Sequence, residues 1–295
     1  MRLQVMKSTV GEIELFQIVE LQQIGPQLTR LLPYATPAEL RKISWLKQPY
    51  VADDYSINGI VQSFIARIGS RVALIDTCVG NDKKRPDHPT WTNMKNDFLG
   101  ALDSVDVNRF DVTDVLCTHM HMDHVGWNTI LQDGKWVPTF PNARYYYSRT
   151  EFEYWETNHG KEAIGPDANE CYADSILPIV RAGLSTLVDD RADLGDGLSF
   201  IPTPGHTKGH VSVVITSGAD KLIVTGDCVH HPCQFARPDW SATADYDKAQ
   251  SRQTRMDLFC DAAEDGAVVV GSHFNIPSMG RIEKDADGSF VFKPL

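Results

Sequence analysis

Short runs of apolar residues, many of them β-branched, recur in both halves of the chain and predict β-strands. The predicted strands lie at 14–22, 60–68, 71–77 and 111–119 in the first half, and at 198–206, 210–218, 221–227 and 267–274 in the second. Near the C-terminus, the stretch RIEKDADGSFVFK predicts a hairpin that turns at Asp287-Gly288.

Helices are predicted between these strands. The sequence Thr36-Pro37-Ala38-Glu39 has the pattern of a capping box with proline at the first helical position, so a helix is expected from there toward Trp45. Other helices are expected at 91–104, 149–157, 173–187 and 245–263. Two strand-rich halves, each with helices, predict an α/β fold in the form of a four-layer αβ/βα sandwich. No linker-like stretch interrupts the chain, so residues 1–295 are expected to form a single domain.

Composition excludes some classes of partner. The formal net charge of -11 disfavours a nucleic-acid backbone as the main partner, because such binding depends on basic surface. No run approaches the ~18 apolar residues of a membrane span, and the N-terminus has no signal-peptide pattern. The six cysteines lack paired spacing. We therefore expect a cytoplasmic protein with reduced thiols that binds neither nucleic acid nor membrane.

Metal-capable side chains stand where predicted strands end. The stretch CTHMHMDHVGW crowds several of them into a few residues, and others follow the runs FIPTPG, LIVTG and VVVGS. In each case glycine or another small residue lets the backbone turn beside the polar side chain. Strand ends that converge on one edge would gather the whole set, which consists of His119, His121, Asp123, His124, His206, Asp227 and His273.

Five imidazoles and two carboxylates are a typical donor set for zinc. They are too many for one tetrahedral ion and suit two ions that share a carboxylate. Two divalent ions about 3.5–4 Å apart can share a hydroxide, because they lower the pKa of water toward ~7. The alternative, a set of buried and hydrogen-bonded polar residues, does not explain their placement at strand ends. A separate zinc site at Cys228–Cys233 lacks a second ligand pair, so these cysteines are expected in the core.

The HxHxDH motif, followed in order by PGHT, GD and SH elements, resembles the metallo-β-lactamase superfamily of dinuclear hydrolases. The resemblance implies two divalent metal ions, with zinc expected first and manganese, iron or cobalt as alternatives. It places His119, His121 and His206 on one ion, and Asp123, His124 and His273 on the other. It further implies that Asp227 bridges the two ions and that Asp76, in LIDT, supports a ligand histidine.

The branch within this superfamily is indicated by the segment GDCVHHPCQF. Asp227 matches the glyoxalase II, lactonase and phosphotriesterase-like branches. Acyl-homoserine lactonases carry tyrosine three residues later, where this chain has His230. The GDxxH pattern, with HVGWN and the block from Lys135 to Trp155, looks like the methyl parathion hydrolase branch. A lactonase that opens lactone or ester bonds with a metal-bridging hydroxide is the leading interpretation, and phosphotriester hydrolysis is an expected side activity.

These residues are also compatible with other functions. An organophosphate hydrolase of the methyl parathion type would use the same metals. A glyoxalase II-like thioesterase would be expected to have a basic C-terminal region, which GRIEKDADGSFVFKPL does not supply. A metal-binding protein without turnover often lacks a ligand, whereas every ligand position is filled here. A nuclease is disfavoured by the acidic charge. The resemblance also makes a homodimer one expected assembly.

Residues near the chemistry are assigned last. We predict that Asp123, Asp227 and His230 are catalytic, with His230 as a general acid or as a group behind the metals; the alternative is a histidine packed on the sheet. His210 is expected to be structural, and the loop at 81–88 to be exposed. Loop hydrophobics predict a substrate wall, although core packing explains each of them equally well. These wall residues are Leu31, Tyr34, Trp91 and Phe235.

Overall fold

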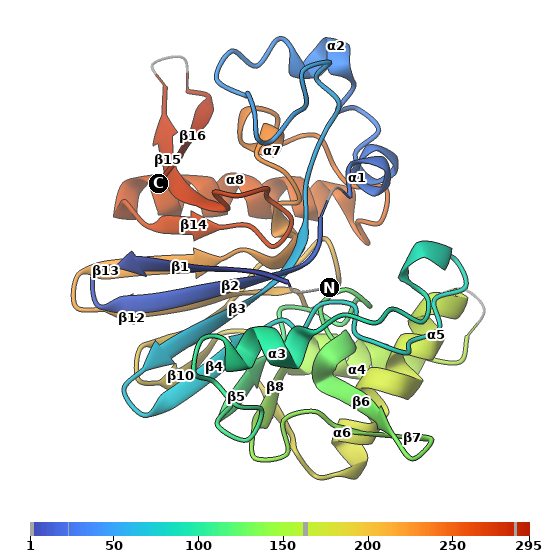
Figure 1. Cartoon of the computed structure of the whole chain (residues 1–295). Helices are drawn as coiled ribbons and strands as arrows, with labels where there is room; N and C mark the ends of the chain where they lie inside the picture. Colours follow the sequence, from blue (N-terminus) through green and yellow to red (C-terminus); the bar gives the residue numbers. More distant parts are fainter. Residues whose placement is uncertain (1–2, 23, 162–164, 286–287) are drawn as a thin grey trace. The chain divides into compact units, whose positions relative to one another are not determined.

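The computed structural model describes residues 3–22, 24–161, 165–285 and 288–295 (Figure 1). The chain divides into two compact units, each with its own seven-stranded sheet. Unit 1 consists of Met1–Thr9, Ile13–Glu20 and Val61–Asp190, and unit 2 consists of Val10–Glu12, Leu21–Ile60 and Arg191–Leu295. Each unit supplies a sheet with helices, as the predicted α/β sandwich requires. That residues 1–295 act as one domain stays a prediction.

The sheet of unit 1 has the strand order β1-β2-β3-β4-β5-β8-β9. Its strands are β1 (Gln4–Val10), β2 (Ile13–Leu21), β3 (Val61–Ile68), β4 (Arg71–Ile75), β5 (Asp114–Leu116), β8 (Arg144–Ser148) and β9 (Ser185–Val188). A separate hairpin pairs β6 (Thr129–Gln132) with β7 (Lys135–Pro138). The helices and helical turns are η1 (Pro89–Trp91), α3 (Phe98–Asp103), η2 (Gly126–Asn128), α4 (Arg149–Asn158), α5 (Pro166–Cys171), the π-helical turn η4 (Tyr172–Ile176) and α6 (Leu177–Arg181).

Parallel pairing in unit 1 brings distant segments to one edge of the sheet. Strands β4, β5, β8 and β9 run parallel, and Ile75 is in register with Leu116. The carboxyl ends of β4 and β5 therefore lie side by side. Asp76 follows the first of these strands directly, and the histidine-rich loop follows the second.

The sheet of unit 2 has the order β10-β11-β12-β13-β14-β15-β16. Its strands are β10 (Ala192–Gly195), β11 (Leu198–Pro202), β12 (Val211–Ser217), β13 (Asp220–Val224), β14 (Val268–Val270), β15 (Met279–Lys284) and β16 (Phe290–Pro294). The helices and helical turns are α1 (Gly25–Leu31), α2 (Pro37–Leu40), η5 (Gly226–Cys228), α7 (Cys233–Ala236) and α8 (Lys248–Asp265). Helix α8 packs on β15, and α7 packs on β16.

One parallel pair of strands in unit 2 likewise brings distant segments to one edge of the sheet. Strands β13 and β14 run parallel, with Val224 in register with Val270. The paired residues, Leu222–Val224 of β13 and the three valines of β14, are buried. Asp227 and His273 each come three residues after these paired positions, so the two side chains leave the sheet at the same edge.

Most of the predicted strands are confirmed, whereas three helix predictions were too long. The helix predicted at 91–104 is confined to α3, Phe98–Asp103. Thr36 caps α2 by accepting a hydrogen bond from the Glu39 amide, yet the helix ends at Leu40. The helix predicted at 173–187 ends at Arg181, and β-strand β9 occupies its last part. The antiparallel pair β15–β16 is present. The predicted turn at Asp287 lies outside the described residues.

The charged loop at 81–88 is exposed only in part, which corrects the prediction of an exposed loop. Lys83 and Arg85 are fully buried, because they surround the Asp174 carboxylate of η4. Arg85 donates to both carboxylate oxygens, at 2.8 and 3.1 Å. The Lys83 ammonium lies 3.6 Å from the centre of the Trp136 ring and donates to Thr129. Burial lowers the pKa of Lys83 to about 8, against the opposing charge of Asp174.

Among the described helices, none has both the length and the apolar character that a membrane crossing requires.

The substitution Asp174→Ala should destabilise the protein strongly, because it leaves two buried cations without their carboxylate. Loss of one partner of such a cluster costs about 3–5 kcal/mol. The measurement is the free energy of unfolding in urea. The control is Asp189→Ala, whose carboxylate is 85% exposed and should change stability by less than about 0.5 kcal/mol. Equal effects of the two substitutions would contradict the buried cluster.

Candidate metal centre

In unit 1, Asp76 organises two of the predicted ligand histidines. Its backbone is left-handed (φ 52°), a conformation that aspartate tolerates. One carboxylate oxygen lies 2.8 Å from His124 Nδ1, which is the contact that the predicted supporting role needs. The Thr118 hydroxyl donates to the same carboxylate, at 2.8 Å, and lies 3.1 Å from His119 Nδ1. With their Nδ1 atoms committed in this way, His119 and His124 present Nε2 as the available ligand atom.

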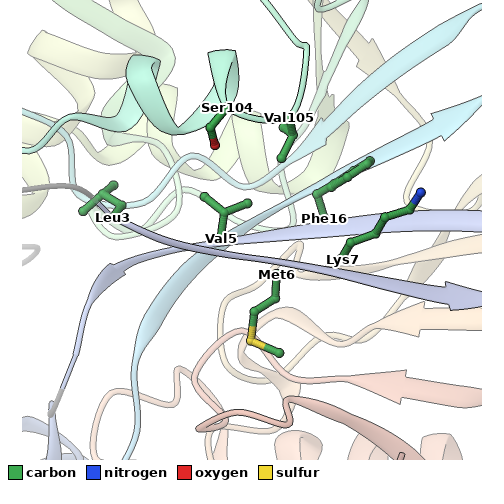
Figure 2. Close-up of a pocket in the computed structure, with 7 residues that line it drawn as sticks. All are labelled: Leu3, Val5, Met6, Lys7, Phe16, Ser104 and Val105. Atoms are coloured by element: carbon green, nitrogen blue, oxygen red, sulfur yellow. The ribbon is translucent and has the colours of Figure 1, made fainter.

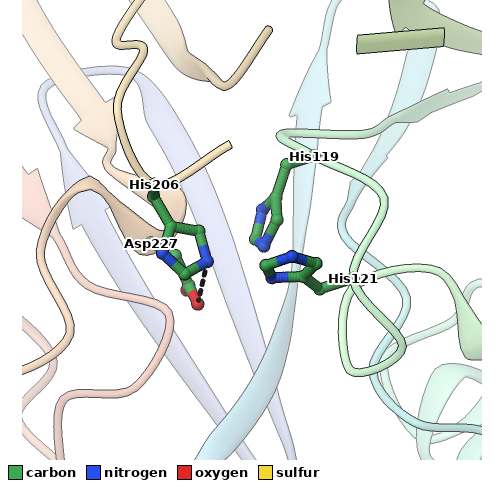
Figure 3. Close-up of side chains that lie close together, drawn as sticks. All are labelled: His119, His121, His206 and Asp227. Carbon is green, nitrogen blue, oxygen red and sulfur yellow. Dashed lines mark ion pairs between the residues drawn. The ribbon is translucent and has the colours of Figure 1, made fainter. Parts of the chain in front are cut away.

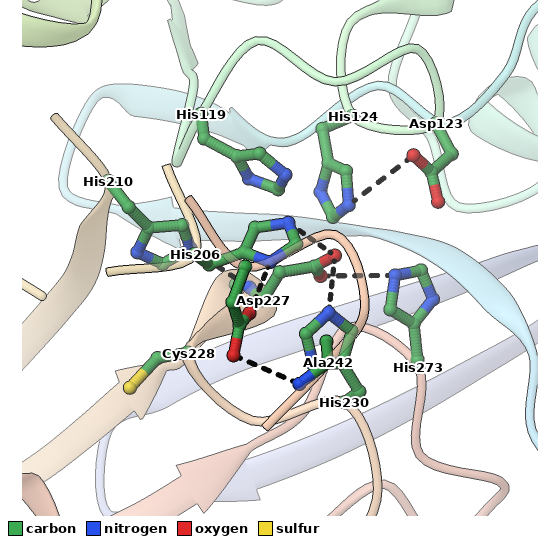
Figure 4. Close-up of polar contacts among 12 residues, drawn as sticks. His119, Asp123, His124, His206, His210, Asp227, Cys228, His230, Ala242 and His273 are labelled. Carbon is green, nitrogen blue, oxygen red and sulfur yellow. Dashed lines mark hydrogen bonds and ion pairs between the residues drawn. The ribbon is translucent and has the colours of Figure 1, made fainter. Parts of the chain in front are cut away.

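The predicted ligands of unit 1 form one group on the loop after β5. The His119 and His121 rings lie 4.6 Å apart and nearly perpendicular, and the His119 and His124 rings lie 4.1 Å apart. His124 Nε2 lies 3.8 Å from an Asp123 carboxylate oxygen. Figure 3 shows His119 and His121 on this loop, and Figure 4 shows the contact between Asp123 and His124. Three imidazoles and a carboxylate are thus presented by six consecutive residues.

Two buried carboxylates that the sequence analysis missed hold this loop and its neighbour. Glu151 accepts hydrogen bonds from the Met120 amide, between the two histidines of the HxH motif, and from the Trp155 indole. Glu20 accepts from the Val79 amide at 2.7 Å and from the Trp127 indole at 2.6 Å. Burial raises the pKa of Glu20, and these hydrogen bonds oppose the shift.

In unit 2, three imidazoles surround the Asp227 carboxylate (Figure 4). His273 Nε2 lies 3.0 Å from one carboxylate oxygen. The Nε2 atoms of His206 and His230 lie 3.4 and 3.3 Å from the other. Figure 3 marks the contact between His206 and Asp227. All four side chains are buried.

The far nitrogen of two of these histidines already has an acceptor. His206 Nδ1 lies 3.0 Å from an Asp245 carboxylate oxygen, and His273 Nδ1 lies 2.9 Å from the Ile60 carbonyl. Both rings therefore carry hydrogen on Nδ1, and their Nε2 lone pairs face the Asp227 carboxylate. Lone pairs and a carboxylate that face each other in a buried site repel unless a cation lies between them. This donor set therefore fits a divalent metal ion.

His210 is structural, as predicted. Its Nε2 accepts a hydrogen bond from the Asp227 amide at 2.9 Å, and its Nδ1 lies 2.9 Å from the Thr203 hydroxyl. The ring therefore fixes the backbone of the Asp227 turn.

Asp245 is a site residue that the sequence analysis missed. Burial acts to raise its pKa, but the hydrogen bond to His206 and the nearby charge of Arg255 lower it to about 2. The carboxylate is therefore charged wherever the protein is folded at ordinary pH. Asp245 lies 39 residues from His206 in the sequence, in DWSATADYD, which resembles an ordinary polar loop.

His230 is fully buried. Its Nε2 faces the Asp227 carboxylate at 3.3 Å, and its Nδ1 has no hydrogen-bond partner among the described residues. Burial lowers its pKa, and the charge of Asp227 opposes that shift. The Gln234 side chain accepts a hydrogen bond from the His230 amide at 2.7 Å and so fixes the backbone from which the ring projects.

A role in binding substrate stays a prediction for Leu31, Tyr34 and Trp91 of the predicted substrate wall. Phe235 is wrong as a wall residue, because it is fully buried in an aromatic cluster with Phe259, Phe274 and Phe292. Trp91 is 6% exposed and stacks on His88. The other two predicted residues are more accessible: Leu31 is half-buried, and Tyr34 is 61% exposed.

Unit 1 also has a cavity of about 350 Å³ that contains none of the predicted site residues (Figure 2). Val5 and Met6 of β1, Phe16 of β2 and the Ser104–Val105 turn contribute to its lining. The Arg67 guanidinium lies over the Phe16 ring and donates to the Val105 carbonyl, which ties the turn to the sheet.

Comparison with known proteins agrees with this geometry. The family model for the metallo-beta-lactamase superfamily matches residues 57–273. The chain is 30% identical over 196 residues to the N-acyl homoserine lactonase AttM of Azorhizobium caulinodans, which covers 62% of this chain and 66% of that protein. It is 32% identical over 151 residues to the protein of the same name from Rhizobium radiobacter, covering 48% and 51%. The matches thus span just under two thirds of the length of the first relative and about half of the length of the second.

Two solved structures share the fold over almost the whole chain. The dizinc quorum-quenching lactonase AidC, solved with a product, has a TM-score of 0.79 at 24% identity and covers 99% of this chain and 98% of its own. The hydrolase AbOPH has a TM-score of 0.75 at 22% identity, with coverage of 99% and 97%. The predicted α/β fold is therefore confirmed, and the chain belongs to the metallo-beta-lactamase superfamily.

Proposed function

We propose that this protein is a metal-dependent hydrolase that opens lactone rings. The observation that carries the proposal is the Asp227 carboxylate, faced by three imidazole nitrogens at 3.0–3.4 Å. Two of these rings, His206 and His273, are held from behind through Nδ1. Membership of a superfamily of hydrolases supports it. The two curated relatives described above are N-acyl homoserine lactonases, which favours a lactone as the substrate.

The proposed ligand set is the one expected from the sequence. It joins the four side chains of the loop after β5 to three of unit 2, and two divalent ions, zinc first, would occupy it: His119, His121, Asp123, His124, His206, Asp227 and His273. When bound, the ions supply a Lewis acid for the lactone carbonyl and lower the pKa of water.

The protein's own residues hold the proposed metal ligands in a fixed orientation. The net reaction adds water across the ring ester bond, so hydroxyl ends on the acyl carbon and hydrogen on the ring oxygen. Asp76 and Asp245 hold the rings of His124 and His206 in one orientation, which keeps the ligand geometry constant through the reaction. Preorganised donors of this kind need no rearrangement as charge develops on the substrate.

His230 is proposed as a hydrogen-bond donor to a substrate oxygen. Its pKa is lowered by burial, so the imidazole is neutral near pH 7 and carries one N–H and one lone pair. A neutral ring suits hydrogen bonding better than full proton transfer, which narrows the predicted choice between a general acid and a supporting group. Asp123 and Asp227 are proposed to take part in catalysis as metal ligands, because both belong to the proposed ligand set. A homodimer stays a prediction.

Lactones should be the best substrates in a matched panel, because the relatives act on this class of ring. Initial rates are measured on short and long acyl-homoserine lactones, plain γ- and δ-lactones, an aryl ester, methyl parathion and a glutathione thioester. Chelation should abolish turnover, and zinc or manganese should restore it. If the phosphotriester or the thioester were faster by orders of magnitude, the lactonase assignment would be wrong, although the hydrolase assignment would stand.

The substitution Asp227→Ala should lower both metal content and rate, because it removes the carboxylate that three imidazoles face. We expect one or both ions to be lost and kcat/KM to fall at least about 100-fold, the scale expected when metal-site geometry is lost. Metal content is measured by elemental analysis on the folded variant. The control is Asp220→Ala, in the β12–β13 turn of the same unit. Unchanged metal content and rate would rule out the proposed bridging role.

The substitution His230→Phe should lower kcat and leave metal content unchanged, because His230 is not among the proposed ligands. A reduction of about 100-fold is expected for the loss of one positioned hydrogen-bond donor. Phenylalanine preserves the aromatic packing. The matched control is His159→Phe, an exposed histidine stacked on Tyr172. Loss of metal from the His230 variant would instead make this residue a ligand.

A further inference from the structure

We propose that Arg255 positions the metal ligand His206 by acting through Asp245. Arg255 lies on α8, two turns beyond the helix start, and its side chain is fully buried. The sequence gives no motif around it. This inference rests on the proposed role of His206 as a ligand and assigns a further residue to the same site.

Arg255 supplies the balancing charge for Asp245. Its Nη1 lies 3.7 Å from one Asp245 carboxylate oxygen, and the other oxygen of that carboxylate bonds His206 Nδ1 at 3.0 Å. Both charged side chains are fully buried. A carboxylate in such surroundings stays charged only when it is paired, and a charged carboxylate is the stronger acceptor for the imidazole N–H. Arg255 thus keeps Asp245 charged, and Asp245 in turn holds the His206 ring with Nε2 toward Asp227.

The remaining donors of Arg255 fix the surrounding loops. Nε donates to the Pro238 carbonyl at 2.9 Å, and Nη2 donates to the Ser241 hydroxyl at 3.2 Å. Nη1 donates to the Ser251 hydroxyl at 2.6 Å and, at 3.5 Å, to the carbonyl of Cys228, the residue after Asp227. One side chain therefore ties the loop before Asp245 to the turn that carries the other carboxylate of the site.

The start of α8 is itself joined to the His206 loop. The Tyr246 amide donates to the His206 carbonyl, and the Asp247 amide donates to the Gly205 carbonyl. Gly205 has φ 129°, and a Cβ built there would lie 2.3 Å from the Ser251 amide nitrogen. The helix thus reaches the ligand loop at backbone contact. A substitution at Arg255 could therefore disturb His206 by two routes: through Asp245, or through the backbone hydrogen bonds at the start of α8. The experiment must separate these routes.

The experiment is a double-mutant cycle on the full chain, with zinc alone as the probe. Zinc affinity is measured by chelator competition for wild type, R255M, D245N and D245N/R255M. The protonated nitrogen of His206 is read by ¹⁵N NMR on the metal-free protein. The control R252M lies on the exposed side of the same helix. We expect R255M and D245N each to weaken zinc binding at least tenfold, and R252M to stay within twofold of wild type.

The two routes predict different results for the double variant. If Arg255 acts through Asp245, D245N/R255M binds zinc as D245N does, and both populate His206 with hydrogen on either nitrogen. A further tenfold loss in the double variant would overturn the proposal, as would a folded R255M with wild-type affinity and an unchanged His206 tautomer. If R255M does not fold, the comparison of D245N with D245N/R255M decides, because the double variant leaves neither charge isolated.

Failure of the proposed lactonase activity would look different. No substrate enters these measurements, so a protein that binds zinc with the expected pattern and opens no lactone would retain the Arg255 assignment. The His206 tautomer is measured without metal and would decide the case even if zinc bound weakly.

Discussion

The buried Asp227 carboxylate is the constraint on which unit 2 depends. Three imidazoles approach it, and its own amide is held by His210. A negative charge in such a place is costly unless a cation shares the site. The parallel pair β13–β14 brings Asp227 and His273 to the same edge, so the sheet register and the electrostatics of the site are set together.

Unit 1 uses the same arrangement with different residues. The parallel pair β4–β5 places Asp76 beside the histidine loop, where the carboxylate faces His124 Nδ1. In both units a carboxylate behind the ring decides which nitrogen is presented. Glu20 and Glu151 then hold the backbone of the loops by accepting amide and indole hydrogens. Buried acids therefore act at two levels, behind the histidine rings and beneath the loops.

The proposed ligand residues could be picked out from the sequence because their signal is local: closely spaced histidines and small residues at strand ends. The same holds for the Thr36 cap of α2. Asp245, Arg255, Glu20 and Glu151 could not be predicted, because each acts on a segment far away in the sequence. The burial of Lys83 and Arg85 was missed for the same reason, since Asp174 lies about 90 residues further on. Strand β9 was missed because its pattern continues that of the preceding helix.

The close approach of Gly205 to Ser251 has a consequence for how this protein can diverge. A side chain at position 205 has no room, and the loop at 204–207 cannot lengthen without lifting the start of α8. Insertions are therefore better accommodated in other loops. The Tyr34 side chain, in contrast, is 61% exposed, so a substitution at that position meets no such steric limit.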